Sequence, residues 1–296
     1  MTRRRWWLLS GILVVAPILG AAAAGDYTAA RAQGAANANE RPQRSPTVQQ
    51  ASITATPAVA RARVPFGAGE RFTFDVRFGN LKVGTSQMEV RGAEMVRGRE
   101  AWHTTLWIKG GTFFYKVNNV FESWIDTQTL SSLRFVKQQE EGTREGVKYY
   151  EIYPERAAYI ERGENGQEEH RSVSQPLDDG SFLYFARTLP LKQGETYDLN
   201  RYFIPDRNPV RIRVLRRERV TVPAGTFNAI VVRPVIKTKG IFSEDGRAEL
   251  WLSDDSARMI LQLRTRLSFG SLNLFLTSYT PPVRQASRSE TVNARP

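Results

Sequence analysis

Alternating apolar and polar residues mark the stretch 69–84, GERFTFDVRFGNLKVG, as two consecutive strands. Phe72, Phe74, Val76 and Phe78 are apolar at every second position, which is the period of a strand that buries one face. The Gly-Asn dipeptide that follows Phe78 is typical of the turn in an antiparallel hairpin. The pattern therefore predicts a hairpin whose four apolar side chains belong to the core.

The same pattern of strands and turns continues through most of residues 64–283. Turn residues recur at intervals of roughly 8 to 12 positions, a spacing that favours an antiparallel meander or barrel over alternating strands and helices. The run from Ala229 to Val232 is continuously apolar, as expected of a strand covered on both faces. We predict an all-β fold, with a mostly antiparallel curved sheet in the form of a half-barrel or barrel-like meander. After the first strand, further strands are expected at residues 81–90, 101–109, 117–126, 132–140, 146–153, 157–161, 168–173, 196–203, 210–217, 218–222, 227–237, 247–253, 259–269 and 272–279.

One segment, SFLYFARTL at residues 181–189, departs from the strand pattern. It follows Asp178-Asp179-Gly180 and precedes Pro190, so an acidic or serine cap begins a short helix and the proline ends it. Its residues are apolar nearly all round, which indicates a buried helix. The sequence therefore predicts one short helix near residues 179–189, covering one end of the sheet.

The N-terminus has the three parts of a secretory signal peptide. Arg3-Arg4-Arg5 precede an apolar run from Trp6 to Leu19, and Ala22-x-Ala24 supplies a cleavage triplet. We predict a signal peptide at residues 1–24. The alternative is an uncleaved anchor, but the apolar run contains Pro17 and is shorter than the roughly 20 residues that span a bilayer.

Two further segments carry no apolar period. Residues 25–63 are rich in Ala, Gln, Asn, Pro and Arg, and cannot bury enough apolar surface to offset the entropy of ordering, so they are predicted to form a disordered linker. Residues 284–296 are predicted to form a disordered tail. With no second linker between them, residues 64–283 are expected to fold as a single β domain.

Composition removes several classes of protein. The chain has no cysteine, which excludes a lipidated cysteine, a disulfide framework and a thiolate catalytic or metal site. The formal net charge is +12, but most of the excess lies in residues 1–63 and 284–296. Mixed charges inside the domain are typical of a solvated surface, so no nucleic-acid partner is expected.

Four stretches resemble a known family. They are GERFTFDVRFGNLKVG, LYFARTLPL, VTVPAGTFNAIVVRP and AELWLSDDSARMILQL, in this order along the chain. Together they resemble the exported bacterial proteins grouped as domain of unknown function 3108, over residues 64 to about 282. The resemblance implies a Gram-negative envelope protein with a curved, mostly antiparallel β structure. It implies no established activity and no catalytic residue.

Residues able to perform acid, base or metal chemistry are few. His103 and His170 are far apart and lack the short spacing of a zinc site, so no metal and no cofactor are predicted. Adjacent carboxylates on a strand point to opposite faces, which argues against either Asp-Asp pair as a catalytic pair. Asp178 and Asp179 are interpreted as helix caps, and Asp254 and Asp255 as part of a hairpin loop.

An aromatic cluster surrounds the Gly110-Gly111 pair. Such side chains either form the core of the sheet or line a pocket for an acyl chain or a sugar ring, and both interpretations are open. The candidate ligand-binding residues are Trp107, Phe113, Phe114, Tyr115, Phe121 and Trp124. Serine-hydrolase and nucleotide-binding motifs do not occur, so no catalytic residue is assigned.

The preferred hypothesis is an exported, periplasmic β-rich protein of the Gram-negative envelope. It binds an amphipathic envelope component, lipid or glycan, or a partner in envelope assembly, without catalysis, and has no transmembrane span once the signal peptide is removed. The alternative is a hydrolase of envelope polysaccharide that brings carboxylates together from distant strands, for example Asp75, Glu122 or Asp126. An enclosed apolar cavity would favour the first hypothesis, and two carboxylates facing each other across a cleft would favour the second.

Overall fold

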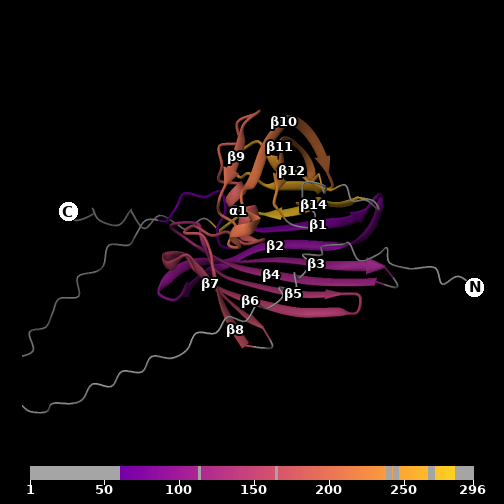
Figure 1. The fold of residues 1–296 in the computed structure, drawn as a ribbon. Coiled ribbons are helices and arrows are strands. Elements are labelled where there is room, and N and C mark those ends of the chain that lie inside the picture. The colour runs from indigo at the N-terminus through magenta and orange to yellow at the C-terminus, as the bar shows by residue number, and fades with distance from the viewer. Residues whose placement is uncertain are drawn as a thin grey trace, which may run out of the picture. The chain divides into compact units, whose positions relative to one another are not determined.

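The computed structural model describes residues 61–112, 115–163, 166–237, 242, 247–265 and 271–283. The predicted signal peptide, the predicted tail and all but the last three residues of the predicted linker lie outside these residues. Residues 61–63 contact the domain, because the Ala62 backbone N–H donates to the Thr127 carbonyl at 2.8 Å. Within the described ranges the chain forms fourteen strands, one α-helix and two short 3-10 helices (Figure 1).

Seventeen helices and strands follow one another along the described residues. The strands are β1 (Arg71–Phe78), β2 (Leu81–Val96), β3 (Arg99–Thr112), β4 (Tyr115–Asp126), β5 (Ser132–Glu141), β6 (Arg144–Tyr153), β7 (Ala158–Gly163), β8 (Gly166–Arg171), β9 (Thr196–Leu199), β10 (Val210–Val222), β11 (Gly225–Val235), β12 (Glu249–Ser253), β13 (Ile260–Arg264) and β14 (Leu272–Thr280). The helices are η1 (Pro154–Arg156), α1 (Ser181–Ala186) and η2 (Pro205–Arg207).

All fourteen strands belong to one sheet, in the order β8-β7-β6-β5-β4-β3-β2-β1-β14-β13-β12-β11-β10-β9. Consecutive strands pair antiparallel in the sheet, except β8 and β9, which form its two edges, and β1 also pairs antiparallel with β14 near the centre. The chain therefore runs from the centre to the β8 edge, passes through α1, and returns from the β9 edge to the centre, where β1 and β14 lie side by side (Figure 1). The predicted all-β, mostly antiparallel fold with one short helix is confirmed.

Irregular pairing bends this sheet. Register shifts interrupt the pairing of β1 with β2, of β2 with β3 and of β10 with β11, and such bulges increase local twist. Residues 210–217 and 218–222, predicted as two strands, form the single strand β10 with a bulge between Val214 and Arg216. Gly84 faces Gly110 across β2 and β3 at a point where a Cβ on Gly84 would lie 2.3 Å from the Lys109 carbonyl. Only glycine permits this close approach of the two backbones.

The core lies on the inner face of the bent sheet. Phe72, Phe74 and Val76 are buried as predicted, whereas Phe78, at the end of β1, is half-buried. The continuously apolar run from Ala229 to Val232 is fully buried in β11, which confirms its predicted burial. Side chains of both halves of the sheet and of α1 form one contiguous apolar cluster, so the two halves share a core.

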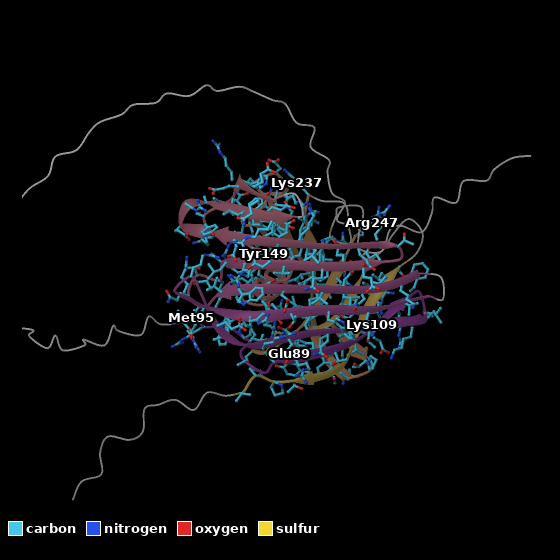
Figure 2. All side chains as sticks on the ribbon, turned by 90° about the horizontal axis from the view of Figure 1, so that it is seen from below. Glu89, Met95, Lys109, Tyr149, Lys237 and Arg247 are labelled. Atoms are coloured by element: carbon cyan, nitrogen blue, oxygen red, sulfur yellow. The ribbon has the colours of Figure 1, made fainter. Side chains whose placement is uncertain are left out.

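The opposite face of β2–β6 is mainly polar and carries a smaller apolar cluster. That cluster contains Val96, Ala101, Trp124, Leu133 and Val136. Figure 2 shows the side chains on this part of the molecule, including Glu89 on β2, Lys109 on β3 and Tyr149 on β6. None of the helices in the described residues has the length and apolar character needed to cross a membrane.

Candidate ligand cavity

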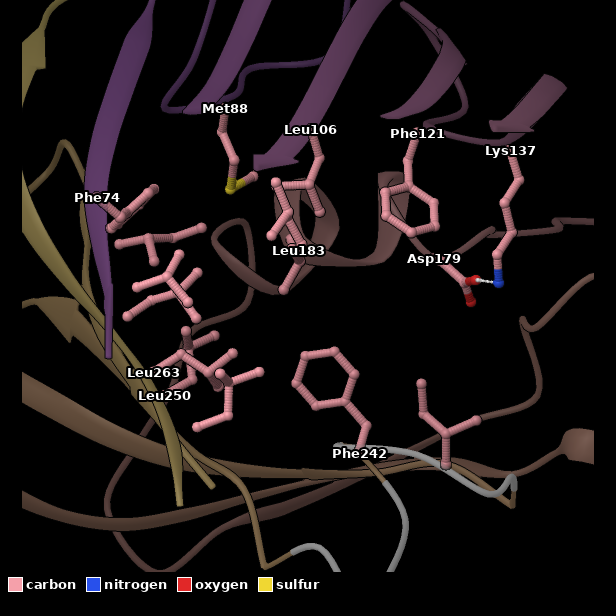
Figure 3. Close-up of a pocket in the computed structure, with 16 residues that line it drawn as sticks. Phe74, Met88, Leu106, Phe121, Lys137, Asp179, Leu183, Phe242, Leu250 and Leu263 are labelled. Carbon is pink, nitrogen blue, oxygen red and sulfur yellow. Dashed lines mark ion pairs between the residues drawn. The ribbon is translucent and has the colours of Figure 1, made fainter. Parts of the chain in front are cut away.

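The inner face of the sheet lines an apolar cavity of about 100 Å³ (Figure 3). Fourteen of the sixteen lining residues are apolar, and they come from β1 to β4, from β12 to β14, from α1 and from the segment after β11. Strand alternation accounts for the lining residues of β1, β3 and β14, which are two positions apart on each strand. Examples are Phe74 and Val76 on β1, Leu106 and Ile108 on β3, and Leu272 and Leu274 on β14.

Lys137 and Asp179 are the two polar residues of the lining, and they lie together at one end of the cavity (Figure 3). Lys137 Nζ is 3.9 Å from Asp179 Oδ2, and the Lys137 side chain is only 5% exposed. Burial lowers the pKa of Lys137, and the charge of Asp179 opposes this shift. Tyr202 donates a hydrogen bond of 2.5 Å to the other oxygen of Asp179.

A buried carboxylate fixes the start of α1 against the sheet. Asp178 Oδ1 accepts hydrogen bonds from the backbone N–H groups of Gly180 and Ser181, both at 2.8 Å, so Asp178 caps the helix as predicted. The hydroxyls of Ser123 on β4 and Ser132 on β5 donate to the same carboxylate at 2.6 Å. Burial raises the pKa of Asp178 to about 6, although these hydrogen bonds lower it. Asp179, the other predicted cap, is thereby directed to the cavity.

An arginine just after α1 ties three distant segments together. Arg187 donates two hydrogen bonds of 2.7 Å to Glu70, and neither side chain is exposed. It also donates to the backbone carbonyls of Pro65, Ala257 and Arg258. Glu70, Arg187 and the 257–258 backbone belong to three of the four sequence stretches that carry the family resemblance. These three stretches are therefore joined by the hydrogen bonds of the buried Arg187 guanidinium.

The candidate aromatic residues are divided between the two faces of the sheet. Phe121 lines the cavity, whereas Trp124 lies on the opposite face, where it stacks on His103 with ring centroids 4.3 Å apart. Trp107 is half-buried and lies between the lining residues Leu106 and Ile108, so alternation directs it away from the cavity. Phe113 and Phe114 lie outside the described residues, and Tyr115 begins β4.

The two polar residues of the cavity are absent from the sequence-derived candidates. One signal for Lys137 is present, since Phe135 and Lys137 are two positions apart on β5 and must share a face. Phe135 is a buried core residue, so a lysine on the same face is unusual. For Asp179 no comparable signal exists, because its position follows from the turn that leads into α1.

The carboxylates considered for the hydrolase alternative do not meet at a cleft. Each is paired with a nearby cation instead. The pairs are Asp75 with Lys82, Glu122 with Arg91 and Asp126 with Arg99. Asp179 is the single carboxylate among the residues that line the cavity. The described residues contain no group of three or more His, Cys, Asp or Glu side chains that could hold a metal ion.

A second hollow, of about 360 Å³, is polar. It is lined by Arg216, Arg233, Arg247, Glu249, Trp251, Arg264 and Thr265. Glu249 accepts hydrogen bonds from two of these arginines, and the Arg264 guanidinium lies 5.6 Å from the centroids of the Trp251 and Phe275 rings. Arg216 and Arg233 are thus paired with a carboxylate, and Arg264 is stacked on aromatic rings.

The protein is thus an antiparallel β protein whose bent sheet lines an apolar cavity. The chain belongs to the family described as "Protein of unknown function (DUF3108)", whose sequence profile matches residues 73–277. The match confirms the resemblance inferred from the four sequence stretches. No curated protein matches the sequence.

Three solved structures of bacterial proteins are similar to this chain. A beta-barrel-like DUF1849 protein from Brucella abortus is 9% identical, with a TM-score of 0.47, and the alignment covers 73% of this chain and 98% of that one. A protein from Parabacteroides distasonis, provisionally described as a lipoprotein, is 11% identical, with a TM-score of 0.34 and coverages of 73% and 98%. A protein from Bacteroides fragilis, provisionally described as exported and having a YmcC-like fold, is 10% identical, with a TM-score of 0.28 and coverages of 75% and 100%.

Proposed function

We propose that the domain binds the apolar part of an amphipathic lipid of the cell envelope in its inner cavity, and does so without catalysis. The observation that carries the proposal is the lining, in which fourteen of sixteen residues are apolar. Burial of an apolar chain against such a surface is favourable by about 0.8 kcal/mol per CH₂ group. The signal peptide predicted at residues 1–24 would bring the domain to the periplasm, where such lipids are available.

The lining favours a lipid over a glycan. Every buried hydroxyl of a sugar needs a hydrogen-bond partner, and an unpaired one is costly to bury. Lys137 and Asp179 are the polar side chains that the cavity offers, and both lie at one end. An acyl chain needs no partner along its length, so it matches the rest of the surface.

The volume limits the length of chain that fits. Since about 10 to 15 Å³ of such space holds one water-sized group, a cavity of about 100 Å³ accommodates roughly seven to ten of them. A chain of about eight carbons therefore fills the cavity. The additional carbons of longer chains would remain outside the cavity, where they add little to the binding free energy.

A series of neutral alcohols tests this proposal without involving a charged head group. We expect affinity for the full-length protein to rise by roughly fourfold per CH₂ from 1-hexanol to 1-octanol and to level off by 1-dodecanol. Leu106→Trp fills part of the cavity and should weaken 1-octanol binding at least about tenfold. Isothermal titration calorimetry measures both effects.

The control is Val147→Trp, which introduces the same side chain at an outer position that is 64% exposed. It should leave the affinity unchanged, and far-ultraviolet circular dichroism verifies that both variants are folded. Absence of saturable binding, or equal affinity in wild type and the folded Leu106→Trp variant, would refute the proposed function.

A further inference from the structure

Lys137 is a buried ammonium with unused hydrogen-bonding capacity. The side chain is 5% exposed and projects from the inner face of β5. Its nearest counter-charge among the described residues is Asp179 at 3.9 Å, which is longer than a hydrogen bond. An ammonium group has three N–H donors, and buried donors are normally satisfied. The face of the Phe121 ring, 5.4 Å from Nζ, offers a weak attraction and no acceptor oxygen.

Asp179 is held independently of Lys137. Its Oδ1 accepts the Tyr202 hydroxyl at 2.5 Å, and Arg207 Nη1 in turn donates to that hydroxyl oxygen at 3.1 Å. A hydroxyl and a nearby guanidinium thus already stabilise the carboxylate. Lys137 is therefore free to engage another anion without leaving Asp179 unpaired.

The surroundings of Lys137 restrict what such an anion can be. Apart from Asp179, the lining residues that share the cavity with Lys137 are apolar (Figure 3). A small hydrated ion would lose its water against these side chains without compensation. An anion attached to an apolar chain gains from burial of the chain and from the ammonium together.

We propose that Lys137 binds the head group of the ligand and that this head group is a carboxylate, so that the ligand class is a fatty acid or a similar single-chain carboxylic acid. The inference rests on the proposed function, because it assigns the polar end of the same cavity. One ammonium neutralises one negative charge, which suits a carboxylate. A phosphate monoester carries up to two charges, would face Asp179, and finds no arginine among the lining residues.

The test compares ligands of equal chain length at pH 7 by calorimetry with the full-length protein. Wild type should bind octanoate roughly tenfold or more tightly than 1-octanol, since charge-assisted hydrogen bonds to a buried ammonium are strong. Octyl phosphate should bind more weakly than octanoate. Lys137→Met, which keeps the length and apolar stem of the side chain, should lose the preference for octanoate and retain 1-octanol binding.

The matched control is Lys192→Met in the segment between α1 and β9, where the lysine is 75% exposed and lies 3.8 Å from Glu195. This variant should keep the wild-type preference. Equal affinity of wild type for octanoate and 1-octanol, or an unchanged preference in Lys137→Met, would overturn the assignment of Lys137 while 1-octanol binding upholds the proposed function. Tighter binding of octyl phosphate would overturn the carboxylate. If none of the three ligands binds wild type, both proposals fail. This outcome is measured on the wild-type protein alone and does not depend on whether a variant folds.

Discussion

Two acid–base pairs lie inside the domain, and they are built in opposite ways. Arg187 and Glu70 are fully buried and joined by two hydrogen bonds of 2.7 Å, and the guanidinium also donates to three backbone carbonyls. Lys137 and Asp179 approach only to 3.9 Å, and the Lys137 ammonium makes no hydrogen bond to another described residue. The guanidinium therefore has several hydrogen-bond acceptors within the fold, and the ammonium has none among the described residues.

The difference separates a structural charge from one that is available to a ligand. Arg187 donates to acceptors in the segment before β1 and in the loop between β12 and β13. Removal of either charge would leave the other buried without compensation. Lys137 has free donors beside an apolar cavity. The comparison predicts a large loss of stability in one place and a loss of binding preference in the other.

The largest expected effect is that of Arg187→Met. Glu70 would remain fully buried as an unpaired charge, and three carbonyls would lose their donor, so the free energy of unfolding should fall by about 3–5 kcal/mol. Urea denaturation followed by tryptophan fluorescence measures the change. The double variant Arg187→Met, Glu70→Gln should recover part of the loss, because it removes the orphaned charge. A loss below about 1 kcal/mol in the single variant would contradict the structural role of the pair.

Asp178 sharpens the comparison, since it is a buried charge satisfied by hydrogen bonds without a cation. Its pKa is about 6 in the folded protein, above its ordinary value, so the folded state holds the proton more tightly than the unfolded chain. This residue therefore makes the free energy of unfolding decrease as pH rises from about 4 to about 6, by up to about 3 kcal/mol.

Asp178→Asn removes that contribution. The stability difference between wild type and variant should thus become less favourable to wild type between pH 4 and pH 7, as measured by urea denaturation at each pH. Asp206→Asn, on the exposed η2 turn, controls for the loss of one carboxylate. A difference that is constant with pH, or that shifts towards wild type as pH rises, would show that Asp178 is not the titrating group.

The smallest stability effect is expected for Lys137→Met. The ammonium loses little on replacement because it makes no hydrogen bond to the described residues, and its apolar stem is preserved. Asp179 keeps the Tyr202 hydroxyl. The free energy of unfolding should change by less than about 1 kcal/mol, and an increase or a decrease within this range is consistent with the proposed role of Lys137. A loss as large as that of Arg187→Met would remove the distinction between the two pairs.

Much of the local structure can be predicted from the sequence. Of the four residues of β1 that alternation assigns to the core, three are buried, and Asp178 caps the start of the predicted helix. The helix ends at Ala186, before the Pro190 that was expected to end it. The break predicted between residues 217 and 218 was wrong, because a bulge in β10 changes the apolar period without ending the strand.

The cavity could not be predicted in the same way. Its lining depends on which strands meet across the bend, and the pairing of β1 with β14 leaves no mark in either strand alone. Phe121 and Trp124 are three positions apart on β4, so alternation alone assigns them to opposite faces, but it does not say which of the two faces lines the cavity. Lys137 was detectable in principle from its spacing to Phe135.

The pairing of β1 with β14 also governs when the domain is finished. Thr277 donates a hydrogen bond to the Thr73 carbonyl, 204 positions earlier in the chain. At a synthesis rate of about 5 to 20 residues per second, the first strand waits roughly 10 to 40 seconds for the last. Until then the backbone N–H and C=O groups on one side of β1 are unpaired and can form hydrogen bonds with strands of other chains. A chain that leaves the ribosome in this order cannot complete its sheet until nearly the whole domain has been synthesised.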